Sequence, residues 1–218
     1  GNGFWNDPDI VYWLDSNVTV PVGQTLTVAP GQVIKFGWYN ANLIVAGTLN
    51  AVGTPSAPII FTDRHDDSAG GDTNNNGSSA AGSERWGAIQ FQSGSTGNVM
   101  DYVDVRWGGY WYHDGMVMLD HAALTLTNST LQHSSSDGVR IVASNPTLTN
   151  NTYNDNGSAA VSMDLASNPA ITGVTVSNNA INGLQVDSGT LTGNSSWNDP
   201  DIVYWLDSNV TVPVGQTL

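Results

Sequence analysis

The chain has 218 residues, 19 of them acidic and 5 basic, and a formal net charge of −14 at pH 7. So few Lys and Arg exclude a nucleic-acid-binding surface, because phosphate backbones are held by basic side chains. The absence of Cys excludes a disulfide framework, and no apolar run approaches the roughly 20 residues that insertion of a helix into a membrane needs. One Glu and one Lys among many β-branched and turn-forming residues predict an all-β fold.

The segment WNDPDIVYWLDSNVTVPVGQTL, near the start of the chain, occurs twice. It spans residues 5–26 and returns without a change at residues 197–218, an offset of 192 residues. Because so long an identity cannot arise by chance, we interpret residues 1–192 as one repeat unit and residues 193–218 as the start of the next identical unit. The pattern predicts a tandem array, either continuous in one covalent chain or polymerised from separate chains.

Short alternating strands separated by Gly-containing turns follow this segment. Their sequences are LTVAPGQVIKF, NLIVAGTLNAVG, PIIFTD and WGAIQF, the last ending at Phe91. They resemble the N-terminal rungs of secreted right-handed β-helix repeat proteins of the pectin-lyase-like superfold. The resemblance implies a right-handed parallel β-helix and an extracellular or cell-surface setting. Such proteins include adhesins, surface-layer and filament components, and polysaccharide-active enzymes, so function has to be argued from the sites.

A long polar insertion, residues 63–85, interrupts these strands. Its stretch Asp-Thr-Asn-Asn-Asn-Gly matches the start of a calcium loop, in which alternate side-chain oxygens converge on the ion and Gly takes the sharp turn. The end departs from that pattern, since the twelfth position is Ser83, with Glu84 adjacent. A calcium site would therefore borrow carboxylates from the start of the insertion; the alternative is a solvated Asn/Gly loop without metal. The predicted ligands are Asp66, Asp67, Asp72, Asn74 and Asn76.

An aromatic cluster follows in the segment RWGGYWYHDG, residues 106–115. Aromatic rings beside an Asp can stack sugar rings on a β-helix surface, which makes this segment a candidate glycan site. Bulky rings on a solenoid also cover an open face or fill lateral contacts between molecules, and that interpretation stays open. The predicted carbohydrate-binding residues are Trp107, Tyr110, Trp111 and Tyr112.

The second half of the unit contains a shorter, degenerate period. TLTNST begins at Thr125, TLTNNT at Thr147, AITGVT at Ala170 and TLTGNS at Thr190, in steps of 22, 23 and 20 residues. Coils of 20–23 residues with two or three short strands predict a parallel β-helix, in which stacked strands lie about 4.8 Å apart. A β-sandwich is the alternative fold, but it does not explain equivalent positions that recur in phase.

The same period predicts which side chains point inward and which form the corners. The predicted inward column consists of Leu126, Leu148, Ile171 and Leu191. Asn is expected at the turns, because it tolerates left-handed backbone angles and can form ladders with the Asn of the next coil.

Catalytic and ice-binding functions find little support in the residues. In the proteins that the chain resembles, lyases use calcium with an Arg or Lys base, and hydrolases use Asp pairs with a His. Neither set of motifs occurs here, and an acidic surface repels polyuronate substrates. The Thr column that an ice-binding solenoid needs is interrupted at Ala170. We therefore expect no enzymatic activity.

The continuity between the two repeat copies favours a structural function. The last coil runs into the second copy without a linker or a capping helix, so successive units can stack along one axis. We therefore expect an extracellular or cell-surface fibre, stalk, sheath or adhesin shaft whose partner is another copy of itself, joined head to tail. A carbohydrate-binding or adhesive module that uses the aromatic cluster is the alternative. The predicted assembly interface contains Trp5, Trp13, Trp197 and Trp205.

Overall fold

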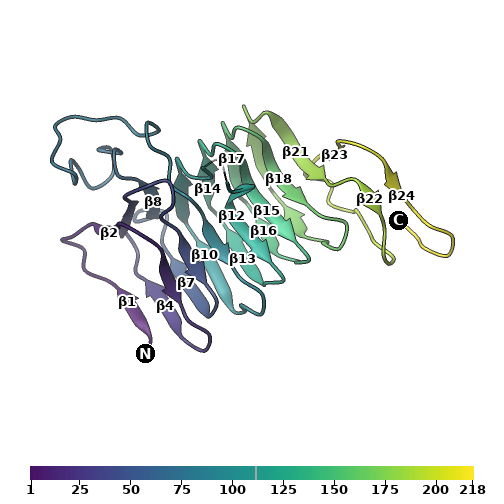
Figure 1. The fold of residues 1–218 in the computed structure, drawn as a ribbon, viewed down its shortest axis with the longest axis horizontal. Helices are drawn as coiled ribbons and strands as arrows, with labels where there is room; N and C mark the ends of the chain where they lie inside the picture. Colours follow the sequence, from purple (N-terminus) through teal and green to yellow (C-terminus); the bar gives the residue numbers. More distant parts are fainter. Residues whose placement is uncertain (111) are drawn as a thin grey trace.

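A computed structural model of the chain describes residues 1–110 and 112–218, which form an elongated stack of coils with the chain termini at opposite ends (Figure 1). Each regular coil contributes one strand to each of three parallel sheets, A, B and C, and coils follow one another along the stack. This architecture confirms the predicted all-β parallel solenoid. The part of the chain that the structure describes contains no helix and therefore no helical segment that could cross a membrane.

The strands of the three sheets alternate strictly along the chain until the last coil. Sheet A contains β1 (Gly3–Trp5), β4 (Thr25–Val28), β7 (Thr48–Val52), β10 (Asn98–Asp101), β13 (Leu124–Thr127), β16 (Thr147–Thr149) and β19 (Ala170–Thr172). Sheet B contains β2 (Tyr12–Leu14), β5 (Val33–Phe36), β8 (Ile59–Asp63), β11 (Val103–Arg106), β14 (Thr130–Gln132), β17 (Thr152–Asn154) and β20 (Thr175–Ser177). Sheet C contains β3 (Val18–Val20), β6 (Leu43–Val45), β9 (Ile89–Phe91), β12 (Gly115–Asp120), β15 (Asp137–Val142), β18 (Ala159–Met163), β21 (Ile181–Val186) and β23 (Tyr204–Leu206).

The coil period predicted for the second half is confirmed by the strand register. Thr125 pairs with Thr147, and Thr147 pairs with Ala170, so the steps of 22 and 23 residues are one turn of the solenoid each. The fourth predicted member is wrong. Thr190 belongs to β22 (Gly189–Thr190), which pairs with β24 (Val210–Thr211) instead of β19. The regular stack therefore changes its pairing at the point where the second repeat copy begins.

The interior is a continuous column of apolar side chains that runs along the stack. The predicted inward residues Leu126, Leu148, Ile171 and Leu191 are all buried. Near the insertion the column contains aromatic rings, where Trp86 stacks on Phe36 with the ring centroids 4.0 Å apart. Each buried Leu or Ile side chain contributes on the order of 1.5–3 kcal/mol relative to the exposed state. The stability of the stack therefore comes from apolar burial between neighbouring coils. A coil at an end of the stack has a neighbour on one side only and buries less apolar surface.

Asn side chains connect neighbouring coils at the corners, as the sequence predicts. Asn156 donates from Nδ2 to Oδ1 of Asn179 at 2.7 Å, and Asn150 donates to Asn128 at 3.3 Å. Asn128 and Asn150 also have positive φ angles of 50° and 56°, which Asn tolerates better than most residues. These corners explain why the sequence is rich in Asn without being disordered.

Candidate functional site

The insertion leaves the stack after β8 and returns before β9, and a buried carboxylate closes its base. Asp63 accepts the N–H of His65 at 2.6 Å and the N–H of Gly82 at 2.5 Å. Burial raises the pKa of Asp63 above its ordinary value, although both backbone hydrogen bonds oppose this shift. Asp63, the last residue of β8 in sheet B, thus ties the two ends of the insertion together.

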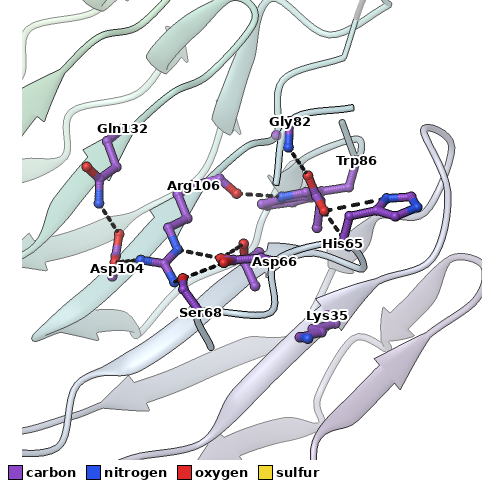
Figure 2. A network of polar contacts seen from close by, with 12 residues as sticks. Lys35, His65, Asp66, Ser68, Gly82, Trp86, Asp104, Arg106 and Gln132 are labelled. Carbon is purple, nitrogen blue, oxygen red and sulfur yellow. Dashed lines mark hydrogen bonds and ion pairs between the residues drawn. The ribbon is translucent and has the colours of Figure 1, made fainter. Parts of the chain in front are cut away.

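Arg106, at the end of β11, organises the acidic groups beneath the insertion (Figure 2). Its Nε donates to Oδ2 of Asp66 at 2.8 Å, and its Nη1 donates to Asp104 at 3.0 Å. Burial alone would raise the pKa of Asp66, but hydrogen bonds from Ser68 and Thr62 and the Arg106 charge outweigh it and hold this pKa below its ordinary value. Asp66 is therefore an ionised internal partner of Arg106.

Asp104 lies on the other side of the same guanidinium and behaves differently. Burial raises its pKa, and the Arg106 charge and a hydrogen bond from Gln132 offset this only in part. The two carboxylates that flank Arg106 therefore differ in their pKa because Asp66 receives more hydrogen bonds. Both carboxylates accept hydrogen bonds from Arg106, and the bond to Asp66 holds the insertion against sheet B.

The turn that was predicted to start a calcium loop is folded around Asp72. The Asp72 carboxylate accepts the N–H groups of Asn76 at 3.2 Å and of Gly77 at 3.0 Å, and Asn74 Oδ1 also accepts the Asn76 N–H at 3.3 Å. Asp67 instead accepts the Ser79 N–H at 2.7 Å. Among residues 1–110 and 112–218 there is no group of three or more His, Cys, Asp and Glu side chains suited to a metal ion. Calcium binding by these residues and Asp66 stays a prediction.

Lys35 is the residue near the insertion that the sequence analysis missed. It projects from β5, is fully buried, and donates from Nζ to the Gly71 carbonyl at 2.7 Å. Burial lowers its pKa, while the nearby carboxylates, Asp67 first and Asp66 second, raise it. An ammonium group therefore already supplies positive charge to this acidic region. The only signal in the sequence was that the single Lys of the chain stands in an apolar strand.

The predicted aromatic cluster is divided between two environments. Trp107 stacks on His133 with the ring centroids 4.0 Å apart, and Gly82 of the insertion lies so close that an added Cβ would meet the indole at 2.7 Å. Tyr110 instead packs against Tyr39 at 5.1 Å, and Tyr112 is largely exposed. Trp111 lies outside the described residues.

This division changes which surface can bind a sugar. A groove of about 520 Å³ runs between the insertion and the neighbouring coils, lined by Ser68, Ala80, Arg106, Trp107, Gln132 and His133 among others. Trp107 is a ring of this lining. The exposed rings of Trp38 and Tyr39 are not among the lining residues; Tyr39 packs beside the half-buried Tyr110, and the Arg64 guanidinium of the insertion lies 4.0 Å above the ring of Trp38. Tyr39 was not predicted as a neighbour of the cluster, because about 70 residues separate it from Tyr110 along the chain.

The two repeat copies share their main internal contacts. In the first copy, residues 5–26, Trp5 stacks on Tyr12 with centroids 5.2 Å apart; in the second copy, residues 197–218, Trp197 stacks on Tyr204 at 5.5 Å. The N–H of Asp7 donates to the Tyr12 hydroxyl at 3.3 Å, and its counterpart in the second copy makes the same bond at the same distance. These contacts form within the segment and do not depend on what surrounds it.

The surroundings of the two copies are complementary. Ile10 is 53% exposed whereas its counterpart Ile202 is 6% exposed, because Ile202 packs on the coil before it. Leu14 is 4% exposed whereas its counterpart Leu206 is 48% exposed, because Leu14 is covered by the coil after it. Each copy thus shows one half of the environment of the segment. Of the predicted interface residues, Trp13 and Trp205 are exposed, while Trp5 and Trp197 are partly buried against their own copy.

The second copy contacts the preceding coil by strand pairing and by hydrogen bonds to two of its own Asp carboxylates. β23 pairs with β21, and β24 pairs with β22. At the edge of sheet A no further strand is added in the described part of the chain; instead Asp199 accepts the Ile171 N–H at 2.8 Å and Asp201 accepts the Gly173 N–H at 2.7 Å. The Asp-Pro-Asp of the repeat therefore closes a sheet edge, a role that the sequence analysis did not predict.

Comparison with protein families identifies the class of the fold. The family model for the right handed beta helix region matches residues 86–204, more than half of the chain, and the chain belongs to this family. The expected right-handed β-helix is thereby confirmed. No curated protein and no solved structure matches the chain. A β-helix is consistent with a structural or adhesive repeat, but the fold occurs in enzymes as well.

Proposed function

We propose that the chain is a structural repeat of an extracellular or cell-surface shaft, in which units stack head to tail along one axis. One observation carries the proposal: the same 22-residue segment is covered from one side at the start of the stack and from the other side at its end. A segment that presents complementary apolar faces to both neighbours suits a joint inside a continuous array. The acidic surface adds solubility to such an exposed array.

The length of a unit follows from the sheets. β23 lies seven strand-to-strand steps beyond β3 in sheet C, and β3 belongs to the coil in which the first copy of the segment lies. At about 4.8 Å per step, one unit advances the axis by roughly 34 Å. Electron microscopy of the purified native array should show unbranched rods with an axial repeat of this size. Isolated particles of a single unit length would contradict the proposal.

Catalysis is not part of the proposed function. Asp66, the buried carboxylate that lines the groove, is bound to Arg106, which also holds Asp104. Incubation with pectin, polygalacturonate, alginate and neutral glycans should release no product. Turnover that disappears on Asp66→Asn substitution would overturn this.

An adhesive function is the second candidate, and the exposed rings beside the insertion favour it. Exposed aromatic rings stack well on the apolar faces of sugars. A glycan array should then show binding that is lost in Tyr110→Ala, which removes the ring that packs on Tyr39, and retained in Trp205→Ala, which removes an exposed ring on β23 at the other end of the stack. Binding that survives Tyr110→Ala would remove this candidate.

If calcium supports the insertion, chelation should expose the insertion to proteolysis and leave the β-sheet spectrum unchanged.

A further inference from the structure

The strand pairings of the two copies define what the joint between units looks like. The segment β2 of the first copy has the same sequence as β23 of the second copy. Yet β2 begins sheet B, where it pairs with β5, whereas β23 extends sheet C, where it pairs with β21. The next strand also changes its partner, because β3 begins sheet C whereas its counterpart β24 pairs with β22 in a separate two-stranded sheet. The displacement by one face is therefore carried by β2 and β23.

We propose that consecutive units join by this segment with a shift of one face, so that sheet C of one unit continues as sheet B of the next. The inference rests on the proposed stacking of units and adds the partner surface: residues 5–26 of a second copy of the chain, docked on β21 and β22. In this joint Ile10 takes the place of Ile202, and Asp7 and Asp9 accept the N–H groups of Ile171 and Gly173.

The contacts of the second copy, residues 197–218, define the docking surface. β21 pairs in register with the second copy, Gln185 opposite Trp205, and Ile202 lies in the core beneath it. In the first copy every group that would make these contacts is exposed: Ile10, Asp7, Asp9 and the outer edge of β2. Because the sequence is identical and the ring stacking and the Asp N–H to Tyr hydroxyl bond are shared, the first copy already has much of the shape that fits the surface on which the second copy lies.

In a chain that carries both copies, the chain's own second copy binds the surface on β21 and β22 in preference to the first copy of another molecule. It is tethered directly to β21, and short tethers give an effective concentration on the order of mM, so it outcompetes the first copy of another molecule at ordinary concentrations. Weakening only the second copy should reverse this competition. The first copy of a neighbouring molecule then docks in its place, and repetition of this exchange yields an open chain of molecules.

The test is a matched pair of substitutions in the full 218-residue chain. Ile202→Asp puts a charge into the core beneath the second copy and should convert the protein from monomers into concentration-dependent dimers and longer assemblies, measured by analytical ultracentrifugation. Ile10→Asp, the same change at the exposed counterpart, should leave the protein monomeric. The double variant should also stay monomeric, because neither copy can dock. A monomeric Ile202→Asp chain, or assembly that persists in the double variant, would overturn the inference.

A synthetic peptide separates failed docking from failed folding. A fluorescent peptide with the sequence of residues 5–26 should bind the Ile202→Asp chain and shorten its assemblies, while the same peptide carrying Asp at the Ile position should not. Absence of peptide binding to an Ile202→Asp chain whose central strands remain protected from hydrogen exchange would also overturn the inference.

The shift of one face is tested by cross-linking, which the absence of Cys makes clean. The register predicts that Trp13 of one molecule lies opposite Gln185 of another, as Trp205 does within the chain. A join without the shift would continue sheet B and place Trp13 in the column that ends at Ser177. In the Ile202→Asp background, Trp13→Cys should form intermolecular disulfides with Gln185→Cys and not with Ser177→Cys. The reverse result would overturn the shifted joint, yet rods of the native array would still support the proposed function.

Discussion

The two copies of one 22-residue sequence separate what a segment determines by itself from what its neighbours determine. They share two internal contacts: an indole stacks on a Tyr ring, and the Asp two residues after the Trp donates its N–H to the Tyr hydroxyl. Their burial differs, with Ile10 and Leu206 exposed and Ile202 and Leu14 buried. The conformation of the segment is thus local, whereas its contribution to stability depends on which neighbouring coil is present.

The largest difference is expected at the Leu of the two copies. Leu14→Ala removes a buried side chain and should lower the free energy of unfolding by about 2–5 kcal/mol, since the loss includes both transfer and cavity contributions. Leu206→Ala alters a half-exposed side chain and should cost less than about 1 kcal/mol. Urea unfolding of the two single variants measures both values. Equal losses would show that the two copies lie in equivalent surroundings and would contradict the burial difference.

A smaller difference is expected at the aspartates that close the edge of sheet A. Asp201→Ala leaves the Gly173 N–H without its acceptor, which should cost roughly 0.5–1.5 kcal/mol and speed hydrogen exchange at that amide. Asp9→Ala, the counterpart in the first copy, should leave exchange at Gly173 unchanged. Asp201→Asn keeps an acceptor oxygen and should restore most of the protection. Fast exchange in both Asp201 variants would mean that the hydrogen bond does not close this edge.

The fold could be predicted from the sequence because its period is visible. TLTN recurs at Thr125 and Thr147 with the spacing of one coil, and the register confirms these pairs. The prediction failed at Thr190 for a physical reason. Alternating polar and apolar residues show that a strand has an inner and an outer face, but all three faces of the solenoid share this pattern, so the sequence does not say which sheet a strand joins.

The candidate sites were predicted less well than the fold because they depend on contacts between distant coils. Asp66 was predicted as a calcium ligand from its position near the Asn-rich turn, but its partner Arg106 comes from a strand 40 residues further along the chain. The interface was predicted at Trp5, Trp13, Trp197 and Trp205, but Trp5 and Trp197 pack within their own copy. The complementary burial instead falls on Ile and Leu, whose role becomes visible only when both copies are seen with their neighbours.

The smallest expected difference between the two copies is in the pKa of the Tyr204 hydroxyl in the second copy. Burial, together with a 2.8 Å hydrogen bond from its hydroxyl to the Asp199 carboxylate, raises the pKa of Tyr204 to about 12 from an ordinary value of 10.0. Because the folded pKa lies above the unfolded value, the docked segment keeps a contribution to stability below pH 10 and loses it as the pH rises from 10 to about 12. Phenolate absorbance is measured against pH in the parent chain and in the Tyr204→Phe variant. The difference between the two curves is the titration of Tyr204.

We expect that difference signal to titrate near pH 12 in the parent chain and to move toward pH 10 in Ile202→Ala, which loosens the second copy from β21. Ile10→Ala should leave the titration unchanged, because the first copy lies at the other end of the stack. A Tyr204 signal near pH 10 in the parent chain would mean that the second copy is not docked on the preceding coil. The pKa of one hydroxyl thus reports whether a repeat segment is joined to the unit before it.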